Sequence, residues 1–329
     1  MAVTIKDVAK LAGVSTATVS RVINNDPRIS NETKRKVMKC LEELDYKVNG
    51  IARSLKTNKS YTIGFMCPEL SNVFYMTIAK GVEDELKKQG YSLIICNSNE
   101  SIEEEQARLE LLCEKCVDGV IIIPATNEGA HYNRLNTMNI PSILVDRLVD
   151  NFTTEAVLAD NINGTYSAIE YIISLGHRRI GYIGGDIRIT PAKERDEGYR
   201  RALNDYCIPI EEEIIKYGDF HVQSGYEKMK ELMEGENPPT HIFITNYYMN
   251  VGATKYLVEH KDTVGRQVSI TGFDDMDLAS ILGYGGGLIS QPMMEMGSRA
   301  AQMLLEKLKN EELEFSQVIR LKTDLIKIG

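Results

Sequence analysis

The stretch over residues 14–25 carries short polar side chains on one face of a predicted helix. Its sequence is VSTATVSRVINN, and helical spacing buries Val19, Val22 and Ile23. The opposite face then presents Thr16, Ala17, Thr18, Ser20, Arg21 and Asn24. Hydroxyl, amide and guanidinium groups form hydrogen bonds with phosphates and with base edges in the major groove of DNA. This face therefore predicts a contact with double-stranded DNA, whereas the alternative is a solvated polar face.

The residues around this face predict a helix-turn-helix. Ala9, Gly13 and Val19 have the spacing at which a small residue, a tight turn and an apolar plug bring two helices together. Thr4 opens the first helix, and Ser15 or Thr16 caps the second. A third helix follows in SNETKRKVMKCLEELDY. We expect Thr4 and Ser15, as helix-end hydroxyls, to join the DNA-facing set.

Charge is unevenly distributed along the chain. Residues 1–60 contain 12 Lys and Arg against 6 Asp and Glu, whereas the remaining residues contain 26 against 41. The head is thus basic although the whole chain has a formal net charge of -9. This pattern predicts a polyanion partner for the head alone.

Six scattered cysteines do not suggest a cofactor or a metal. Cys113 and Cys116 form a C-x-x-C, but no second pair or histidine cluster lies at zinc spacing. We interpret them as structural thiols and expect no cofactor. No run of about 18 apolar residues exists, and the first residues lack the apolar core of a secretory signal, so we expect a cytoplasmic protein.

A short hinge follows the head. In YKVNGIARSLKTNKSYTIGF, Asn49 can cap a helix over residues 50–55, and residues 56–60 form a polar linker. Together, TIKDVAKLAGVSTATVSRVINN and ARSL resemble the lactose-repressor (LacI/GalR) family of bacterial transcription regulators. In that family the hinge helix enters the minor groove and a leucine wedges a base step open. The resemblance implies DNA contacts for Asn49, Ala52 and Leu55, although Val48 replaces the usual proline.

The rest of the chain alternates apolar strands with amphipathic helices, the first helices falling near 74–89, 102–115 and 128–138. This βαβ series predicts parallel sheets in two lobes that part near residues 160–163. The expected fold is an all-α helix-turn-helix head and hinge helix joined to an α/β, two-lobed, periplasmic-binding-protein-like core. The expected domains are 1–48 (head), 49–60 (hinge) and 61–329 (core), with an N-lobe of about 61–160 and 292–321 and a C-lobe of about 163–289 and 323–329.

Polar and aromatic residues follow several strands, where ligands bind in such folds. The resemblance extends to SLGHRRIGYIGG, VDGVIIIP, GFDD and QPMMEMG, and it implies eight effector contacts. They are Phe74, Tyr75, Asp146, Arg147, Arg195 (on a helix expected at 192–206), Phe220, Asn246 and Asp274. Carboxylates accept hydrogen bonds from vicinal hydroxyls, guanidinium groups donate, and aromatic rings cover a sugar. The alternative is that some cap strand ends or form ion pairs between lobes.

Two departures from the family pattern stand near these residues. Asn246 is followed by Tyr247 where the family commonly has Asp, which suits a less hydroxylated or acidic ligand. Gly285–Gly287 replace a Pro-x-Leu-Thr type segment, in what we expect to be a loop beside a lobe crossing.

We therefore expect a non-enzymatic transcription regulator, since no dinucleotide, P-loop or G-x-S-x-G motif is present. A homodimer would read a pseudo-palindromic operator, and the absence of a heptad extension favours a dimer. The expected effector is a sugar, sugar acid or sugar phosphate. A protein corepressor docking on the N-lobe remains an open alternative.

Overall fold

The computed structural model describes residues 3–23, 26–46, 59–262, 268–274, 285–309 and 317–327. The chain divides into two compact units, residues 1–60 and residues 61–329. Among the described residues, no helix is long and apolar enough to cross a membrane.

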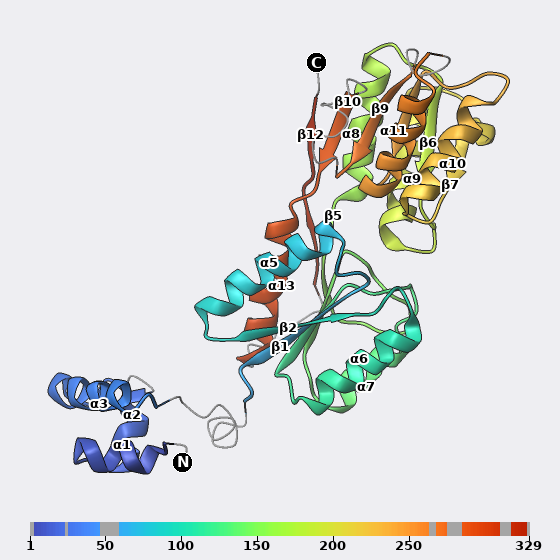
Figure 1. The fold of residues 1–329 in the computed structure, drawn as a ribbon. Helices are drawn as coiled ribbons and strands as arrows, with labels where there is room; N and C mark the ends of the chain where they lie inside the picture. The colour runs from blue at the N-terminus through green and yellow to red at the C-terminus, as the bar shows by residue number, and fades with distance from the viewer. Residues whose placement is uncertain are drawn as a thin grey trace. The chain divides into compact units, whose positions relative to one another are not determined.

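In its described residues the first unit has three helices (Figure 1), which pack around a small apolar core. They are α1 (Ile5–Ala12), α2 (Thr16–Ile23) and α3 (Asn31–Glu43). Gly13 ends α1 with a φ of 60°, a left-handed conformation that glycine adopts without a steric penalty. The core residues come from all three helices: Val8, Ala9, Ala12, Val19, Val22, Val37 and Cys40. The predicted helix-turn-helix is confirmed.

Short polar side chains cap these helices. Ser15, rather than Thr16, caps α2, because its Oγ accepts the backbone N–H of Thr18 at 3.1 Å. At the start of α1, the Asp7 carboxylate accepts the backbone N–H of Thr4 at 2.9 Å and its hydroxyl at 2.7 Å. These bonds satisfy groups that helix ends leave without intrahelical partners.

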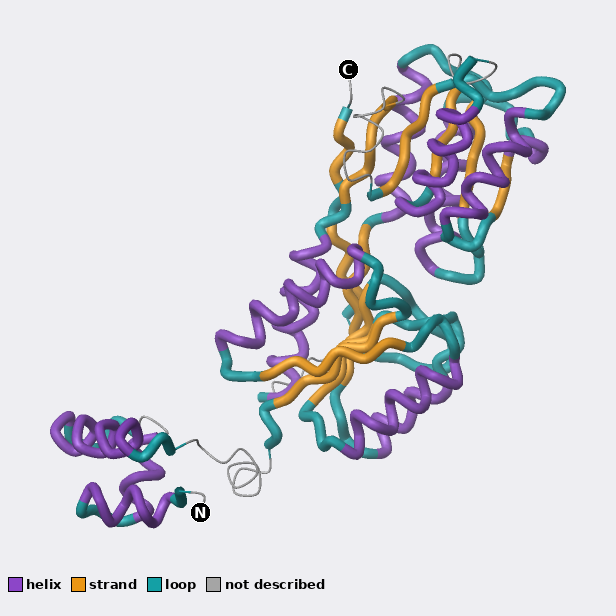
Figure 2. The backbone as a smooth tube through the Cα atoms, in the orientation of Figure 1, coloured by secondary structure: helices purple, strands orange, loops and turns teal. Residues whose placement is uncertain are grey.

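The second unit contains two six-stranded sheets (Figure 2). The N-lobe sheet has the order β11-β5-β4-β3-β1-β2 and is parallel throughout. Helices α5 and α13 cover one face, and α6 and α7 cover the other. The elements are β1 (Thr62–Cys67), α5 (Val73–Lys88), β2 (Ser92–Asn97), α6 (Ile102–Glu114), β3 (Gly119–Ile122), η1 (Ala130–Tyr132), α7 (Asn133–Thr137), β4 (Ser142–Val145), β5 (Glu155–Ala159), α13 (Met293–Leu308) and β11 (Val318–Leu321).

The C-lobe sheet has the order β12-β10-β9-β8-β6-β7, and β12 alone is antiparallel to its neighbour. Helices α8 and α9 pack on one face, and α10 and α11 on the other. The elements are α8 (Asn161–Ser174), β6 (Ile180–Gly184), α9 (Thr190–Asp205), η2 (Glu212–Ile214), β7 (Ile215–Tyr217), α10 (Val222–Met233), β8 (His241–Ile244), α11 (Tyr247–Glu259), β9 (Ser269–Phe273), β10 (Gly285–Ser290) and β12 (Asp324–Ile326). A two-lobed α/β core of parallel sheets is confirmed.

Three connections join the lobes. The chain passes from β5 to α8 at Asp160, from β10 to α13 at residues 291–292, and from β11 to β12 at residues 322–323. The expected helix near 128–138 is instead the short pair η1 and α7. Helix α9 begins earlier than expected, at Thr190, because Pro191 stands at its first turn, where a missing N–H costs nothing.

The expectation of a loop at Gly285–Gly287 is wrong, because these residues form the start of β10 beside β9. The reason lies on β8. His241 is fully buried there, and a Cβ on Gly286 would lie 2.4 Å from its Cε1. Glycine is therefore required by a close side-chain approach within a sheet, and chain flexibility does not explain it.

Candidate functional site

A cavity of about 450 Å³ lies in the core unit, with walls from both lobes. All eight residues expected to contact an effector line it: Phe74, Tyr75, Asp146, Arg147, Arg195, Phe220, Asn246 and Asp274. Asp146 and Asp274 follow β4 and β9 directly, with φ values of 67° and 56°. Non-glycine residues held in this left-handed region cluster at functional sites. The strand ends thus bring together side chains that are far apart in the sequence.

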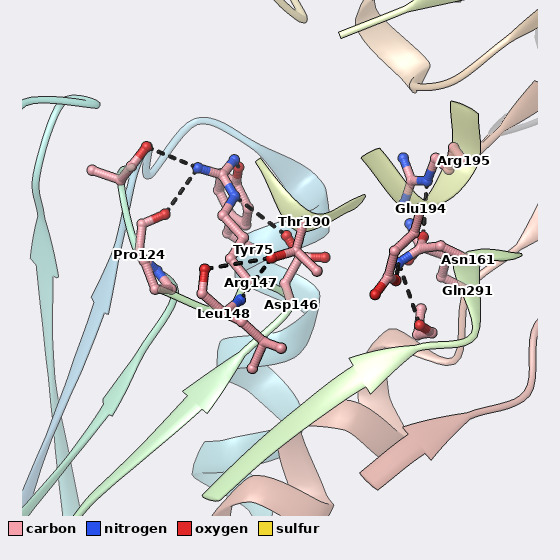
Figure 3. A network of polar contacts seen from close by, with 12 residues as sticks. Tyr75, Pro124, Asp146, Arg147, Leu148, Asn161, Thr190, Glu194, Arg195 and Gln291 are labelled. Atoms are coloured by element: carbon pink, nitrogen blue, oxygen red, sulfur yellow. Dashed lines mark hydrogen bonds and ion pairs between the residues drawn. The ribbon is translucent and has the colours of Figure 1, made fainter. Parts of the chain in front are cut away.

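On the N-lobe side, Arg147 is buried and held by protein acceptors (Figure 3). Its Nη1 donates to the carbonyls of Pro124 and Ala125 at 2.8 and 3.0 Å, and Nη2 donates to the Tyr75 hydroxyl at 2.8 Å. Its Nε makes no hydrogen bond with the described residues and lies 3.6 Å from Oδ2 of Asp146, with which it forms an ion pair. Burial raises the pKa of Asp146, and the guanidinium of Arg147 opposes that rise.

A residue that the sequence did not single out fixes this arrangement. Glu105 on α6 is fully buried, and its Oε2 accepts the backbone N–H of Ala125 at 2.8 Å. Its Oε1 lies 2.8 Å from Nε2 of His131. The peptide group between Pro124 and Ala125 is therefore held on both sides, its N–H by Glu105 and its C=O by Arg147. In the sequence Glu105 lies in an acidic helix start that is typical of exposed residues, so no local signal marks it.

On the C-lobe side, Arg195 is 4% exposed. Its Nε donates to Oδ1 of Asn161 at 2.9 Å and its Nη1 to the carbonyl of Thr245 at 2.5 Å. The guanidinium carbon lies 3.9 Å from the centre of the Phe273 ring, a cation–π contact. Burial lowers the pKa of Arg195, and Asp274 and Asp146 oppose that change. Within the described residues, Nη2 makes no hydrogen bond.

Asp274 and Gln291 form the neighbouring wall. Nε2 of Gln291 donates to Oδ2 of Asp274 at 2.8 Å. Oδ1 of Asp274 and Oε1 of Gln291 are buried and have no hydrogen-bond partner in the part of the chain that the structure describes. Burial raises the pKa of Asp274 to about 6, although Arg195 opposes the rise. Gln291 was not among the expected contacts, although it opens the QPMMEMG motif at a lobe crossing.

Aromatic rings form the rest of the lining: Phe74, Tyr75, Phe220, Tyr247 and Tyr248. Asn246 supports this wall and offers little to a ligand. Its Oδ1 caps α11 by accepting the N–H of Met249, and its Nδ2 donates to the carbonyl of Phe220, both at 3.0 Å. These contacts favour the alternative role for Asn246, which is to cap a strand end.

Two pairs of residues make polar contacts between the lobes at the cavity, Leu148 with Thr190 and Tyr248 with Ser71. The backbone N–H of Leu148 donates to Oγ1 of Thr190 at 3.0 Å, at the first residue of α9 (Figure 3). The Tyr248 hydroxyl donates to the carbonyl of Ser71 at 3.4 Å. The segments that bound the cavity therefore belong to both lobes, and the distance between them depends on the relative position of the lobes.

On the head, the polar face of α2 is exposed as its periodicity predicts. Thr16, Ala17 and Arg21 are exposed, and Thr18 and Ser20 are half-buried. The hydroxyls of Thr4, Ser15 and Thr18 already take part in helix caps. Arg21 makes no hydrogen bond within the described residues, which leaves its donors available. Asn24, Asn49, Ala52 and Leu55 lie outside the described residues.

Comparisons with known proteins cover both units. The family model "Periplasmic binding proteins and sugar binding domain of LacI family" matches residues 60–328, and "Bacterial regulatory proteins, lacI family" matches residues 4–49. The transcriptional repressor PurR of Pasteurella multocida is 34% identical over 98% of this chain and 97% of its own length. Catabolite control protein A of Priestia megaterium is 32% identical over 98% of this chain and 97% of its own length.

Solved structures agree with these matches. A complex of the transcriptional regulator CelR with cellobiose is 28% identical, with a TM-score of 0.74 over 98% of each chain. The lac repressor dimer bound to operator is 24% identical, with a TM-score of 0.86 over 99% of this chain and 98% of that one. The fold predicted from the family resemblance is confirmed along nearly the whole chain.

Proposed function

Because this chain belongs to the LacI family of DNA-binding bacterial transcription regulators, we propose that an uncharged, hydroxyl-rich small molecule in the cavity between its lobes controls its affinity for DNA. The observation that carries this proposal is the mixture of hydrogen-bonding side chains that line the cavity. Arg147 and Arg195 carry donors, and Asp146 and Asp274 carry acceptors. Hydroxyl groups both donate and accept, whereas an anion only accepts and an ammonium group only donates.

The charges around the cavity support the same ligand class. Four carboxylates line it, from Glu69, Glu100, Asp146 and Asp274, against the two guanidinium groups of Arg147 and Arg195. A sugar acid or sugar phosphate would bring further negative charge to this site. Tyr247 gives the lining an aromatic face that can cover a sugar ring, and the surrounding carboxylates disfavour the acidic ligand that this residue suggested from the sequence. Among a sugar, a sugar acid and a sugar phosphate, we therefore propose the uncharged sugar.

We further propose that the chain acts in the cytoplasm as a homodimer on a pseudo-palindromic operator, because a two-fold dimer presents one head to each half-site. The lac repressor, whose solved structure has the same fold, binds its operator as a dimer, which supports this proposal.

The proposal can be tested with the full chain and an operator selected from random duplex DNA. The effect on operator affinity would be measured for a panel of neutral monosaccharides and disaccharides, sugar acids and sugar phosphates. We expect at least one neutral sugar to change the affinity and the charged sugars to have no effect. A response to charged sugars alone, or to none of the panel, would contradict the proposed ligand class. Chromatography with light scattering tests the dimer.

A further inference from the structure

A chain of polar contacts leads from the cavity to the lobe crossings. Asn161 is the first residue of α8, directly after the first crossing, and it is fully buried. Its Oδ1 accepts Nε of Arg195 at 2.9 Å, and its Nδ2 donates to Oε2 of Glu194 at 3.1 Å (Figure 3). The same Nδ2 lies 3.3 Å from the carbonyl of Ala159 at the end of β5. One amide thus contacts the cavity arginine, the neighbouring glutamate and the strand that enters the crossing.

The chain of contacts continues into the other lobe. Glu194 lies on α9 in the C-lobe and is 8% exposed, while Arg320 lies on β11 in the N-lobe, next to the third crossing. Nη1 of Arg320 donates to Oε2 of Glu194 at 2.9 Å and Nη2 to Oε1 at 2.6 Å. Parallel two-bond pairing of this kind fixes the relative orientation of the two groups. Among the ion pairs of the described residues, this is the one that joins the two lobes.

We propose that Glu194 and Arg320 form a joint that sets the angle between the lobes, and that Asn161 couples this joint to effector binding at Arg195. This inference rests on the proposed function, since it assumes that the effector occupies the cavity. Asn161 and Glu194 are positioning residues, because they act through Arg195 and Arg320.

The geometry gives a physical route for the coupling. Arg195 has two of its nitrogens bonded to protein, Nε to Asn161 and Nη1 to Thr245, so an effector that binds Nη2 restrains a group already tied to the crossing. A ligand shifts an equilibrium between lobe arrangements only through its different affinity for each of them. A change in lobe angle moves Glu194 relative to Arg320. Asn161 transmits this change to the cavity, because it bonds Glu194 through Nδ2 and Arg195 through Oδ1.

Two native cysteines allow the lobe arrangement to be measured without a designed label site. Cys116 lies in the N-lobe after α6 and Cys207 lies in the C-lobe after α9, and both are exposed. Cys40, Cys67, Cys96 and Cys113 are buried. Spin labels on the two exposed thiols report the distance between lobes in the full chain. Excess unlabelled chain keeps each dimer to one labelled copy.

The test compares Glu194→Gln and Arg320→Met with the control Glu212→Gln. Glu212 also forms a two-bond pair with an arginine of α9, Arg200, but that pair lies within the C-lobe. We expect the label distance to shift and its distribution to broaden in both joint variants and to stay as in the wild type in the control. Unchanged distances in both joint variants would overturn the proposal, even if one of them folded poorly.

A second measurement separates this inference from the proposed function. Using the neutral sugar with the largest effect on operator affinity, we expect Glu194→Gln to raise the sugar concentration needed for half the effect by about tenfold. Glu212→Gln is the control and should keep the wild-type sugar response, because its ion pair with Arg200 lies within the C-lobe. If no sugar acts on the wild type, the proposed ligand is wrong, while the label distances still decide whether the joint exists. A wild-type sugar response in Glu194→Gln would overturn the coupling.

Discussion

The side-chain amide of Gln291 donates a 2.8 Å hydrogen bond to Oδ2 of Asp274, and Oδ1 of that carboxylate is buried with no partner among the described residues. Asp274 follows β9 and Gln291 follows β10, so the bond joins two adjacent strand ends at the cavity. Burial raises the pKa of Asp274 from its ordinary value of 3.8 to about 6. The ionised carboxylate is the better acceptor for a ligand hydroxyl.

We therefore predict that sugar binding weakens as the pH falls through about 6, by roughly tenfold for each unit below that value. Core stability should change in the opposite direction. Because the folded state holds the Asp274 proton more tightly than the unfolded state, this group contributes stability that is lost as the pH rises from about 4 through 6. Calorimetric titration and thermal unfolding between pH 4 and 8 measure the two effects. Asp274→Asn should remove both pH dependences, and a persistent one would implicate another group.

The sequence predicted the cavity lining well because strand ends are local features. Asp146 and Asp274 each follow an apolar strand, and parallel strands place their carboxyl ends at one edge of a sheet. What holds those side chains depends on partners distant in the sequence. Glu105 and Arg147 form hydrogen bonds with the N–H and the C=O of one peptide group. The sequence around neither residue predicts these bonds.

The wrong prediction of a loop at Gly285–Gly287 has the same cause, a contact with a residue distant in the sequence. A run of three glycines is typical of a flexible loop, but Gly286 packs against a histidine on β8 that the sequence places far away. The pattern of apolar and polar residues predicts which face of a strand a residue lies on. It does not predict which side chain from another strand will contact that residue. For the head, in contrast, the helix-turn-helix could be predicted almost completely, since its turn spacing and apolar positions all lie within one short segment.

Gly286→Ala should destabilise the C-lobe. Its new Cβ would lie 2.4 Å from Cε1 of His241, and burial lowers the pKa of that histidine to about 3, so it stays neutral and enclosed. Overpacking of this kind costs about 1–3 kcal/mol. Chemical unfolding of the full chain measures the loss. Gly235→Ala is the matched control, because the nearest heavy atom to its added Cβ is 3.5 Å away. Equal effects of both variants would show that His241 sets no steric limit at Gly286.

Arg195→Ala should abolish the response to sugar and also weaken the core. Removing the guanidinium leaves Oδ1 of Asn161 and the Thr245 carbonyl without their donor, which costs about 2–5 kcal/mol in a buried network. Operator affinity without sugar should stay at the wild-type value, since the head forms its own unit. Arg195→Lys, which retains the charge, serves as the milder variant. A wild-type sugar response in both would place the ligand elsewhere.

The last prediction concerns the head. Arg21 lies on the exposed face of α2 and makes no hydrogen bond within the described residues, so its donors are available for a base edge. Arg21→Ala should weaken binding to the selected operator by about 1–3 kcal/mol and relax the preference at one base pair of each half-site. Arg28 is the control, because its guanidinium is already bound to Asp26 at 2.7 Å and it lies outside α2. Binding assays against single-base operator variants measure the preference. If Arg21→Ala weakens cognate and random DNA equally, Arg21 contacts a phosphate, and sequence reading must be carried by other residues of the face, such as Thr16 or Ala17.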